Sequence, residues 1–224
     1  MRIGIIVAMD KELNQLRQLF SHPNIRIEKC GIGKVNAALG TQRMIQEFHP
    51  DCIISSGCAG GHGDDVQIQD VVVSTELTYH DVYCGTAVDG STQYGQVQGL
   101  PARYPTDPML LEKAINCWPS ATSQALNVEK PRLHPGLIVT GDWFVDSREK
   151  MHSIVEKFPD VRAVDMESCA IAQTCYLHHI PFISFRIISD VPLRDTNASQ
   201  YHNFWDTVAN HSFFVTRTFV ETLL

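Results

Sequence analysis

Residues 52–61 read CIISSGCAGG, a short apolar run that passes into a string of small residues. The run over residues 52–55 has the length and composition of a buried strand. The small residues at 57–61 predict a turn at its end, because glycine adopts backbone conformations that other residues avoid. Ligands of open α/β sheets bind beyond the carboxyl ends of strands. The stretch therefore indicates an α/β fold in which this turn either admits a ligand or serves chain geometry alone.

Apolar runs and helix-spaced patterns alternate on both sides of this stretch, which favours a largely parallel or mixed sheet with helices on both faces. The other predicted strands are 3–7, 25–27, 71–73, 137–140, 163–164 and 182–188, and the predicted helices are 13–20, 35–48, 167–177 and 204–223. Residues 86–108 lack a clear apolar period and predict a long surface loop near a site or an interface. No linker or repeat divides the chain, so we predict a single domain over residues 1–224.

The composition limits the classes of partner. The chain has 224 residues, 44% hydrophobic and 19% charged, with a formal net charge of −7. This charge argues against nucleic acid or an anionic membrane as a partner, because both require a basic surface. Seven scattered cysteines without a C-x-x-C pair indicate a reduced, cytoplasmic protein. The first residues do not resemble a signal peptide, and no apolar run has the roughly 18 residues of a membrane span.

Carboxylates follow several of the predicted strands. Glu12 comes shortly after strand 3–7, and Glu167 and Asp190 follow two later strands. Together with nearby small and aromatic residues, they suit a pocket for a neutral or cationic planar ligand with hydroxyl groups. Each also has a purely structural explanation, since a carboxylate in a helix's first turn interacts favourably with the helix dipole, and aspartate is common in turns. The histidines show no metal-binding spacing, and Cys58 has no assignable base, which favours a small buried residue over a nucleophile.

Taken together, these segments resemble the methylthioadenosine/S-adenosylhomocysteine nucleosidases of the nucleoside phosphorylase superfamily. The matching strings are MRIGIIVAMDKEL, CGIGKVNAALG, ISSGCAGG, VVVSTELTYHD, VTGDWF, AVDMESCAIA and FRIISDV, in the family's order over residues 1 to about 191. The resemblance implies a three-layer α/β/α fold with a central mixed β-sheet, nucleoside phosphorylase-like. It also implies hydrolysis of the N-glycosidic bond of 5′-methylthioadenosine, S-adenosylhomocysteine and 5′-deoxyadenosine, in methionine salvage and removal of methyl-cycle by-products. No metal or organic cofactor is implied.

The resemblance assigns a role to each matching position. Glu12 matches the carboxylate that activates water, Asp190 the acid that protonates the purine at N7, and Glu167 the carboxylate that holds the ribose hydroxyls. Met166 matches the residue that packs on the sugar, and Phe144 the aromatic residue that stacks on the base. The other expected pocket residues are Met9, Ile32, Cys58, Ala59, Gly60, Val145, Asp165, Arg186 and Ser189, with Tyr201 or Phe204 near the 5′ substituent.

The implied chemistry needs two proton-handling groups. Breaking the bond through an oxocarbenium-like sugar requires an acid at the leaving base and a base at the water, each worth about 10²–10⁴ in rate. A phosphorylase would instead need cations around a phosphate. The segments near Glu12, 31–34 and 57–61 offer only Lys11 and Lys34, which favours water, although Arg186 keeps a purine nucleoside phosphorylase open. A futalosine hydrolase and a non-catalytic nucleoside-binding protein are the remaining alternatives.

The chain also departs from the family pattern. Residues 21–29 are too few for a β-hairpin present in many relatives, and residues 79–94 differ in length. Cys58 replaces a serine, Asp165 replaces a glutamate, and Pro192 follows the ISDV string. Because the family is dimeric, we expect a homodimer whose interface includes part of the segment 79–104, with the partner subunit contributing to the 5′ pocket. The tyrosines of that segment are suitable interface anchors.

Overall fold

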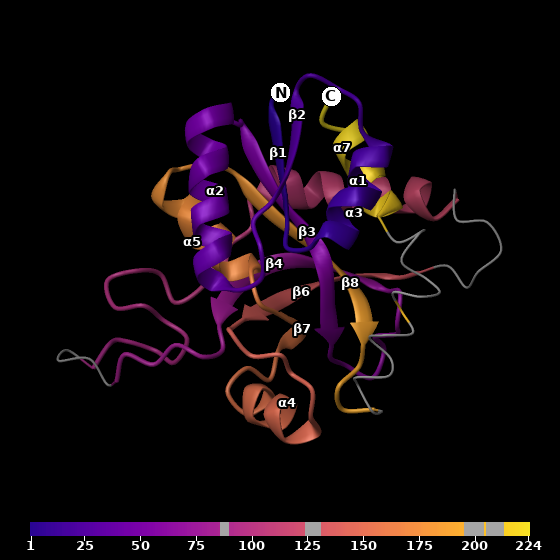
Figure 1. The fold of residues 1–224 in the computed structure, drawn as a ribbon. Helices are drawn as coiled ribbons and strands as arrows, with labels where there is room; N and C mark the ends of the chain where they lie inside the picture. The colour runs from indigo at the N-terminus through magenta and orange to yellow at the C-terminus, as the bar shows by residue number, and fades with distance from the viewer. Residues whose placement is uncertain (86–89, 124–130, 195–203, 205–212) are drawn as a thin grey trace.

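The computed structural model describes residues 1–85, 90–123, 131–194, 204 and 213–224. Its strands are β1 (Ile3–Val7), β2 (Ile25–Lys29), β3 (Cys52–Gly61), β4 (Val71–Tyr79), β5 (Tyr104–Pro105), β6 (Leu133–Thr140), β7 (Val161–Asp165) and β8 (Phe182–Asp190). The helices in this part of the chain are α1 (Asp10–Leu19), α2 (Lys34–Phe48), α3 (Pro108–Ser123), α4 (Arg148–Val155), α5 (Ser168–Leu177) and α7 (Phe214–Glu221). The strands lie at the centre, and the two termini meet at one end of the molecule (Figure 1).

All of these strands belong to one mixed sheet. β1 pairs in parallel with β2 and β3, and β3 pairs in parallel with β8. β8 pairs antiparallel with β4, which pairs in parallel with β6, which in turn pairs in parallel with β7. β7 then returns to β3, antiparallel, opposite Gly60 and Gly61. The sheet therefore closes on itself through five strands, while β1 and β2 extend from β3 as an open flank.

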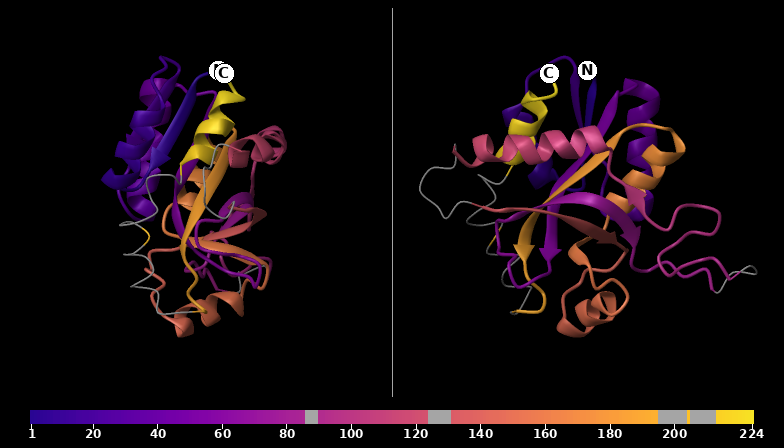
Figure 2. Two further views of the ribbon diagram at one scale, coloured as in Figure 1. Left: turned by 90° about the vertical axis from the view of Figure 1, so that its right-hand side faces the viewer. Right: turned by 180° about the vertical axis from the view of Figure 1, so that it is seen from behind.

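Helices cover both faces of the sheet because successive side chains of a strand point to opposite faces. Ile3 and Ile5 pack in one hydrophobic cluster with α1, α3 and α7, whereas Ile6 packs in a second cluster with α2 and α5. α2 and α5 lie side by side on one flank, and α3 crosses α7 on the other face (Figures 1 and 2). α4 packs on β6 and β7 at the end of the molecule far from the termini. The predicted three-layer α/β/α fold is confirmed, and a single domain over residues 1–224 stays a prediction.

The turn predicted at residues 57–61 is wrong. These residues continue β3, and they pair with β8 and at the end with β7. The lack of a side chain at Gly57 and Gly61 allows close packing against this part of the strand. A Cβ on Gly61 would lie 2.8 Å from Ile188 Cγ2, and a Cβ on Gly57 would lie 2.8 Å from Glu12 Oε1. Every other predicted strand appears at its expected place, and several run longer than their apolar core.

Two helices, α3 and α4, escaped the sequence prediction, and a polar cap marks where each begins. α3 follows Asp107, whose Oδ1 accepts a hydrogen bond from the Leu110 N–H at 3.0 Å. α4 follows Ser147, whose Oγ accepts from the Lys150 N–H at 3.3 Å. Both arrangements satisfy a backbone donor that a helix start leaves unpaired.

The remaining predictions on the chain's course have mixed outcomes. Among the described residues of the segment 86–108, only the short strand β5 and Pro108, the first residue of α3, belong to a helix or strand. Of the predicted helix 204–223, the described residues contain α7. α1 and β2 are separated by residues 20–24 alone, which leaves no room for a hairpin. Within the described residues, no helix is both long enough and apolar enough to cross a membrane.

Candidate active site

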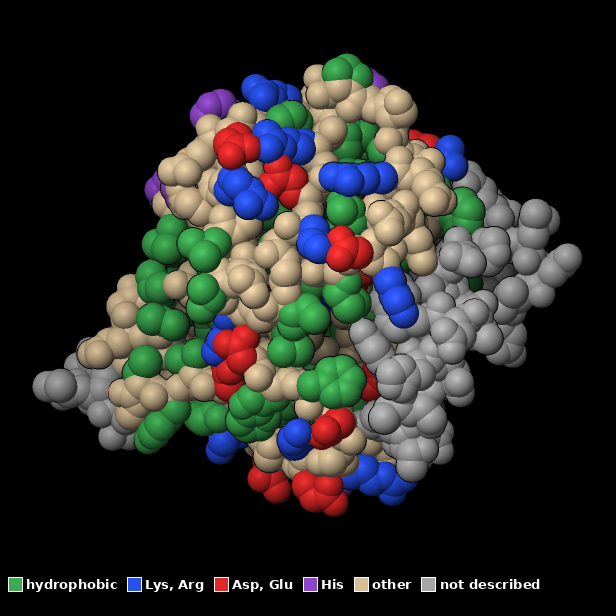
Figure 3. Space-filling view, in the orientation of Figure 1, with side chains coloured by type: hydrophobic (Ala, Val, Ile, Leu, Met, Phe, Trp, Pro, Cys, Tyr) green, Lys and Arg blue, Asp and Glu red, His purple; other side chains and the backbone are tan. Residues whose placement is uncertain are grey.

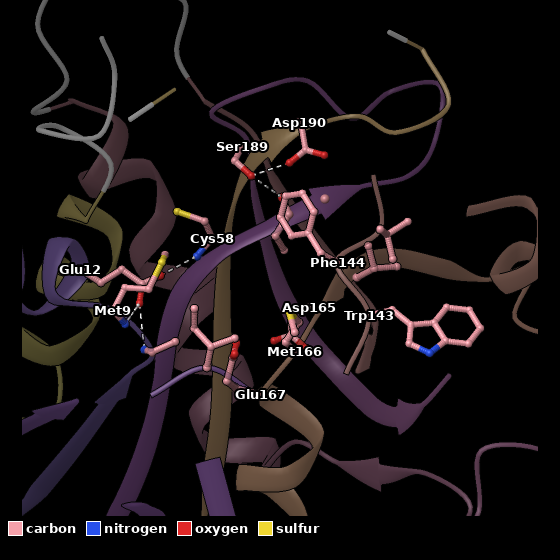
Figure 4. Close-up of a pocket in the computed structure, with 16 residues that line it drawn as sticks. Met9, Glu12, Cys58, Trp143, Phe144, Asp165, Met166, Glu167, Ser189 and Asp190 are labelled. Atoms are coloured by element: carbon pink, nitrogen blue, oxygen red, sulfur yellow. Dashed lines mark hydrogen bonds between the residues drawn. The ribbon is translucent and has the colours of Figure 1, made fainter. Parts of the chain in front are cut away.

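One pocket of about 110 Å³ collects the ends of several strands. Segments after β1, β6 and β7, the β2–α2 turn, β3 and the end of β8 supply its walls (Figure 4). The lining residues are Ala8, Met9, Glu12, Ile32, Cys58, Ala59, Gly60, Trp143, Phe144, Val145, Val164, Asp165, Met166, Glu167, Ser189 and Asp190. Of the described residues that the sequence assigned to the site, the structure thus brings together all except Arg186 and Phe204.

Glu12 lies in the first turn of α1 and is only 2% exposed. Its Oε2 accepts hydrogen bonds from the N–H groups of Ala8 at 2.9 Å and Met9 at 3.0 Å. Its Oε1 accepts from the Cys58 N–H at 3.2 Å, which ties α1 to β3. Burial raises the pKa of Glu12, against the lowering effects of Arg186 and the three N–H groups. The hydrogen bond from the Met9 N–H is one that any carboxylate at a helix start could accept. The hydrogen bond from the Cys58 N–H on β3, in contrast, holds the Glu12 carboxylate at the pocket.

Glu167 stands at the N-cap of α5 and also lines the pocket. Its Oε1 accepts a hydrogen bond at 2.9 Å from the Gly33 N–H, at the start of α2. Burial raises the pKa of Glu167, and the negative charge of Asp165 raises it further, while Arg186 acts in the opposite direction. The carboxylate is therefore held between the beginnings of two helices that lie far apart in the sequence.

Arg186 differs from the expectation, because it does not line this pocket. Its side chain is almost fully buried, and its guanidinium donates to Asp165 Oδ2 at 2.6 Å and to Ser55 Oγ at 2.8 Å. Together with Glu12 and Glu167 it lines a second cavity of about 10 Å³. Burial acts to lower the pKa of Arg186, but the nearby carboxylates raise it above its usual value. The Arg186 cation therefore lies next to Glu12 and Glu167, and its charge acts to lower the pKa of both.

Asp165 lines the pocket, yet both of its oxygens are engaged by the protein. Oδ2 accepts from Arg186, and Oδ1 accepts from the Thr140 hydroxyl at 2.5 Å. The Ser168 N–H, at the start of α5, donates to Oδ2 at 3.1 Å. These contacts give the residue a role in holding Arg186 and α5 beneath the pocket.

Asp190 ends β8 and is 6% exposed. The Ser189 hydroxyl donates to its Oδ1 at 2.7 Å and lies 3.2 Å from the Ala59 carbonyl oxygen. Burial raises the pKa of Asp190 to about 6, while the bond from Ser189 lowers it. A carboxyl group in this setting keeps its proton to a higher pH than an ordinary aspartate.

Aromatic side chains form the outer wall of the pocket. Phe144 is 49% exposed, and Val145 beside it is buried. Trp143, Val164 and Ala8 also line the pocket, although the sequence analysis did not assign them to it. Trp143 and Ala8 directly precede predicted site residues, so their strand-end position was an available signal. The Trp143 ring points away from the carboxylates (Figure 4) and meets the His80 ring edge-on at 5.2 Å.

The remaining predicted positions are settled as follows. Tyr201 lies outside the described residues. Phe204 is buried in the hydrophobic cluster of α1, α3 and α7, and it is not among the described residues that line the pocket. Cys58 lines the pocket, but burial raises the pKa of its thiol well above the usual value, which suits a small packing residue better than a nucleophile. Across the part of the chain that the structure describes, no group of three or more His, Cys, Asp or Glu side chains could hold a metal ion.

Comparison with known proteins places the chain among enzymes. The sequence model of the phosphorylase superfamily matches residues 2–221. The 5′-methylthioadenosine/S-adenosylhomocysteine nucleosidase of Anoxybacillus flavithermus is 34% identical, over 100% of this chain and 99% of its own. The chain belongs to the methylthioadenosine/S-adenosylhomocysteine nucleosidase family. The resemblance read from the seven sequence strings is therefore confirmed.

Solved structures of nucleosidases share the whole fold. The crystal structure of the Neisseria meningitidis nucleosidase in complex with methylthio-immucillin-A matches with a TM-score of 0.86 at 34% identity, covering 99% of this chain and 100% of that one. The Colwellia psychrerythraea nucleosidase in complex with adenine matches with a TM-score of 0.86 at 28% identity, covering 100% of this chain and 96% of that one. The whole chain, including the closed mixed sheet, thus has the fold of these nucleosidases.

Proposed function

We propose that this nucleosidase hydrolyses the N-glycosidic bond of 5′-methylthioadenosine and S-adenosylhomocysteine, releasing adenine and the 5-thioribose product. The observation that carries the proposal is the convergence of three buried carboxyl groups, Glu12, Glu167 and Asp190, on one pocket with an aromatic wall. Membership in the nucleosidase family supports it, and so does the adenine bound to the Colwellia psychrerythraea relative.

The leaving base belongs at the end of the pocket formed by Phe144, Ser189 and Asp190, which lie close to one another in Figure 4. A planar base stacks on the Phe144 ring, and the protonated Asp190 donates to N7. Transfer of that proton lets adenine leave as a neutral molecule. The raised pKa of Asp190, about 6, suits a general acid, because the most effective catalytic acids titrate close to the working pH.

Glu12 acts as the base that activates water. Its carboxylate borders both the main pocket and the cavity of about 10 Å³ that it shares with Arg186. A cavity of this size holds about one water molecule when its walls are polar. Water at this position reaches the pocket beside Glu12, which takes a proton as the oxygen attacks C1′.

Glu167 holds the ribose. One of its oxygens accepts from the Gly33 N–H, which leaves the other for the sugar hydroxyls. Its negative charge stabilises the positive charge that develops on the sugar ring. Met166 lies beside it on the lining of the pocket and packs against the sugar.

Hydrolysis is favoured over phosphorolysis by the state of two cations. The Lys34 ammonium donates to both oxygens of Asp81 at 2.7 Å. The Arg186 guanidinium is bound to Asp165 and Ser55. A phosphate would have to compete with a carboxylate for each of them, whereas a water molecule needs neither cation to be free.

The same proposal includes a homodimer that works in the cytoplasm, where scattered reduced cysteines are stable. Val35 and Leu39 on α2 are 70% and 65% exposed, and Tyr83 beyond β4 is 68% exposed. Hydrophobic side chains gather on the flank that carries these elements (Figure 3). Exposed apolar patches of this kind mark interaction surfaces. A partner subunit on this flank would also help to close the 5′ end of the pocket.

The proposed substrates also include 5′-deoxyadenosine.

The decisive experiment measures adenine release from 5′-methylthioadenosine in phosphate-free buffer. We expect adenine and free methylthioribose, with no acceleration when phosphate is added. Release that depends on phosphate and yields a sugar 1-phosphate would identify a phosphorylase, and binding without turnover would identify a nucleoside-binding protein.

Sedimentation at assay concentrations tests the dimer, since a fully active monomer contradicts it.

A further inference from the structure

A charged network behind the pocket holds two of its walls. Asp81, two residues beyond β4, accepts from the Lys34 ammonium at 2.7 Å and from the Asp142 N–H at 2.8 Å. Asp142, two residues beyond β6, accepts from the Lys34 N–H at 2.8 Å through Oδ1, and its Oδ2 lies 3.7 Å from the Lys34 ammonium. Three elements that are far apart in the sequence thus meet at one lysine. None of these three residues is among those that line the pocket.

The first wall that the network holds is the β2–α2 turn. Gly31 and Gly33 both have positive φ, +99° and +93°, and Ile32 between them lines the pocket. The Gly33 N–H donates to Glu167, and a Cβ on Gly33 would lie 2.9 Å from Asp142 Oδ1. The position of this N–H, and with it the orientation of the Glu167 carboxylate, depends on how Asp142 and Asp81 anchor the first residue of α2.

The second wall is the loop that carries Phe144. Its backbone is anchored at Asp142 by the bond to Asp81, two residues before Phe144. Trp143 is supported edge-on by His80, the neighbour of Asp81. Gly141 makes room for this contact, because a Cβ there would lie 2.3 Å from His80 Cε1. The Asp81 carboxylate therefore fixes the position of both the loop that carries Phe144 and the β2–α2 turn.

We infer that Lys34 and Asp81 are a positioning pair that sets the Glu167 carboxylate and the Phe144 loop in register with each other. The pair differs from an ordinary surface ion pair, which contributes little. The Lys34 and Asp81 side chains are 23% and 10% exposed, and Asp81 binds a backbone N–H in addition to the ammonium. The inference deepens the proposed hydrolase function and depends on it.

The test compares Lys34→Met, Asp81→Asn, the double variant and Lys34→Arg in the full chain. We expect each of the first two to lower kcat about 10- to 100-fold, with a smaller rise in KM, because a misplacement of about 1 Å costs that much in rate. The double variant should lose no more than the worse single variant, since both remove one interaction. Lys34→Arg keeps the charge and should recover most of the kcat lost in Lys34→Met.

The matched control is Arg217→Met on α7, which breaks an exposed ion pair with Glu221 far from the pocket, and it should leave kcat and KM within about twofold. If Lys34→Met and Asp81→Asn kept kcat and KM within about twofold of the wild type, as the control should, the inference would be overturned. Fully additive losses, or losses explained by a reduced folded fraction in thermal melts, would also overturn it. If Lys34→Met fails to fold, Asp81→Asn alone decides the question. A wild-type chain that releases no adenine would instead refute the proposed function.

Discussion

Glu12 and Asp190 are both buried carboxyl groups on one pocket, but different groups oppose the effect of burial on their pKa. Three backbone N–H groups donate to Glu12, and Arg186 adds a positive charge nearby. All four interactions stabilise the carboxylate. Asp190 receives a hydroxyl hydrogen bond from Ser189, which lowers its pKa against the larger effect of burial, and the net pKa is about 6. Burial outweighs all four at Glu12, whose pKa is raised, so both carboxyl groups hold their protons to a higher pH than exposed ones, against three backbone donors and a cation in one case and a single hydroxyl in the other.

In the proposed mechanism this pocket holds both a base, Glu12, and an acid, Asp190. Burial alone raises the pKa of either group. Hydrogen-bond donors and the nearby cation act in the opposite direction, and Glu12 has more of them than Asp190. A pair of carboxyl groups is the usual arrangement for acid and base catalysis at glycosidic bonds.

The largest expected effect concerns the base that leaves from the Asp190 end. A 6-amino purine presents an acceptor at N7 beside a donor at its amine, which a protonated carboxyl matches. A 6-oxo purine presents two acceptors, so a buried polar pair is mismatched, which costs about 10⁴-fold in kcat/KM. The measurement compares 5′-methylthioinosine with 5′-methylthioadenosine, which differ in the base alone. Cleavage of both within tenfold would contradict a protonated Asp190 at the base.

The next effect concerns the Glu12 end. Glu12→Gln keeps the shape but cannot take a proton from water, so kcat should fall about 10²–10⁴-fold while adenine still binds. Glu149→Gln is the matched control, because Glu149 also lies in the first turn of a helix, α4, but is exposed. Steady-state kinetics and adenine titration measure both variants. Equal kcat in the two variants would leave Glu12 as a helix-start residue only.

A smaller effect concerns stability. The unfolded chain ionises Asp190 near its ordinary pKa of 3.8, whereas the folded chain holds the proton until about pH 6. Ionisation therefore destabilises the fold as pH rises from about 4 to 6, and the loss is complete above that range. Asp190→Asn should raise the free energy of unfolding by up to about 3 kcal/mol at pH 7.5. Urea melts at pH 7.5 and below pH 4 test this, since the gain should vanish at the lower pH.

The last effect, about tenfold for each pH unit, is the slope of the pH profile. If Asp190 acts as the acid, kcat/KM should fall about tenfold for each pH unit above the pKa of about 6. The Asp190→Asn variant should be slow and should lack this limb. A wild-type profile that stays flat from pH 6 to 9 would assign the proton to another group. The profile needs only 5′-methylthioadenosine and buffers without phosphate.

The sequence located most of the fold and site because those features are local. Apolar runs identified the central strands, since each strand buries side chains on both faces. Glu12, Glu167 and Asp190 could be found because each follows a strand, and because the neighbouring strings match one family. α3 and α4 were missed, although buried apolar residues recur at helical spacing in both, Leu110 and Ala114 in α3 and Met151 and Ile154 in α4. Their starts are marked by the capping residues Asp107 and Ser147.

What the sequence determined by itself was the order of most strands and helices, the family, and the three carboxyl groups that line the pocket. The tertiary structure decided which distant groups meet. It showed that Gly57 and Gly61 lie within a strand and make room for Glu12 and Ile188, and that Arg186 lies beneath the pocket. It also joined Lys34 to Asp142, 108 residues away. Side-chain pairing across such separations leaves no periodic signal along the chain, because it arises only when the sheet closes and brings the strand ends together.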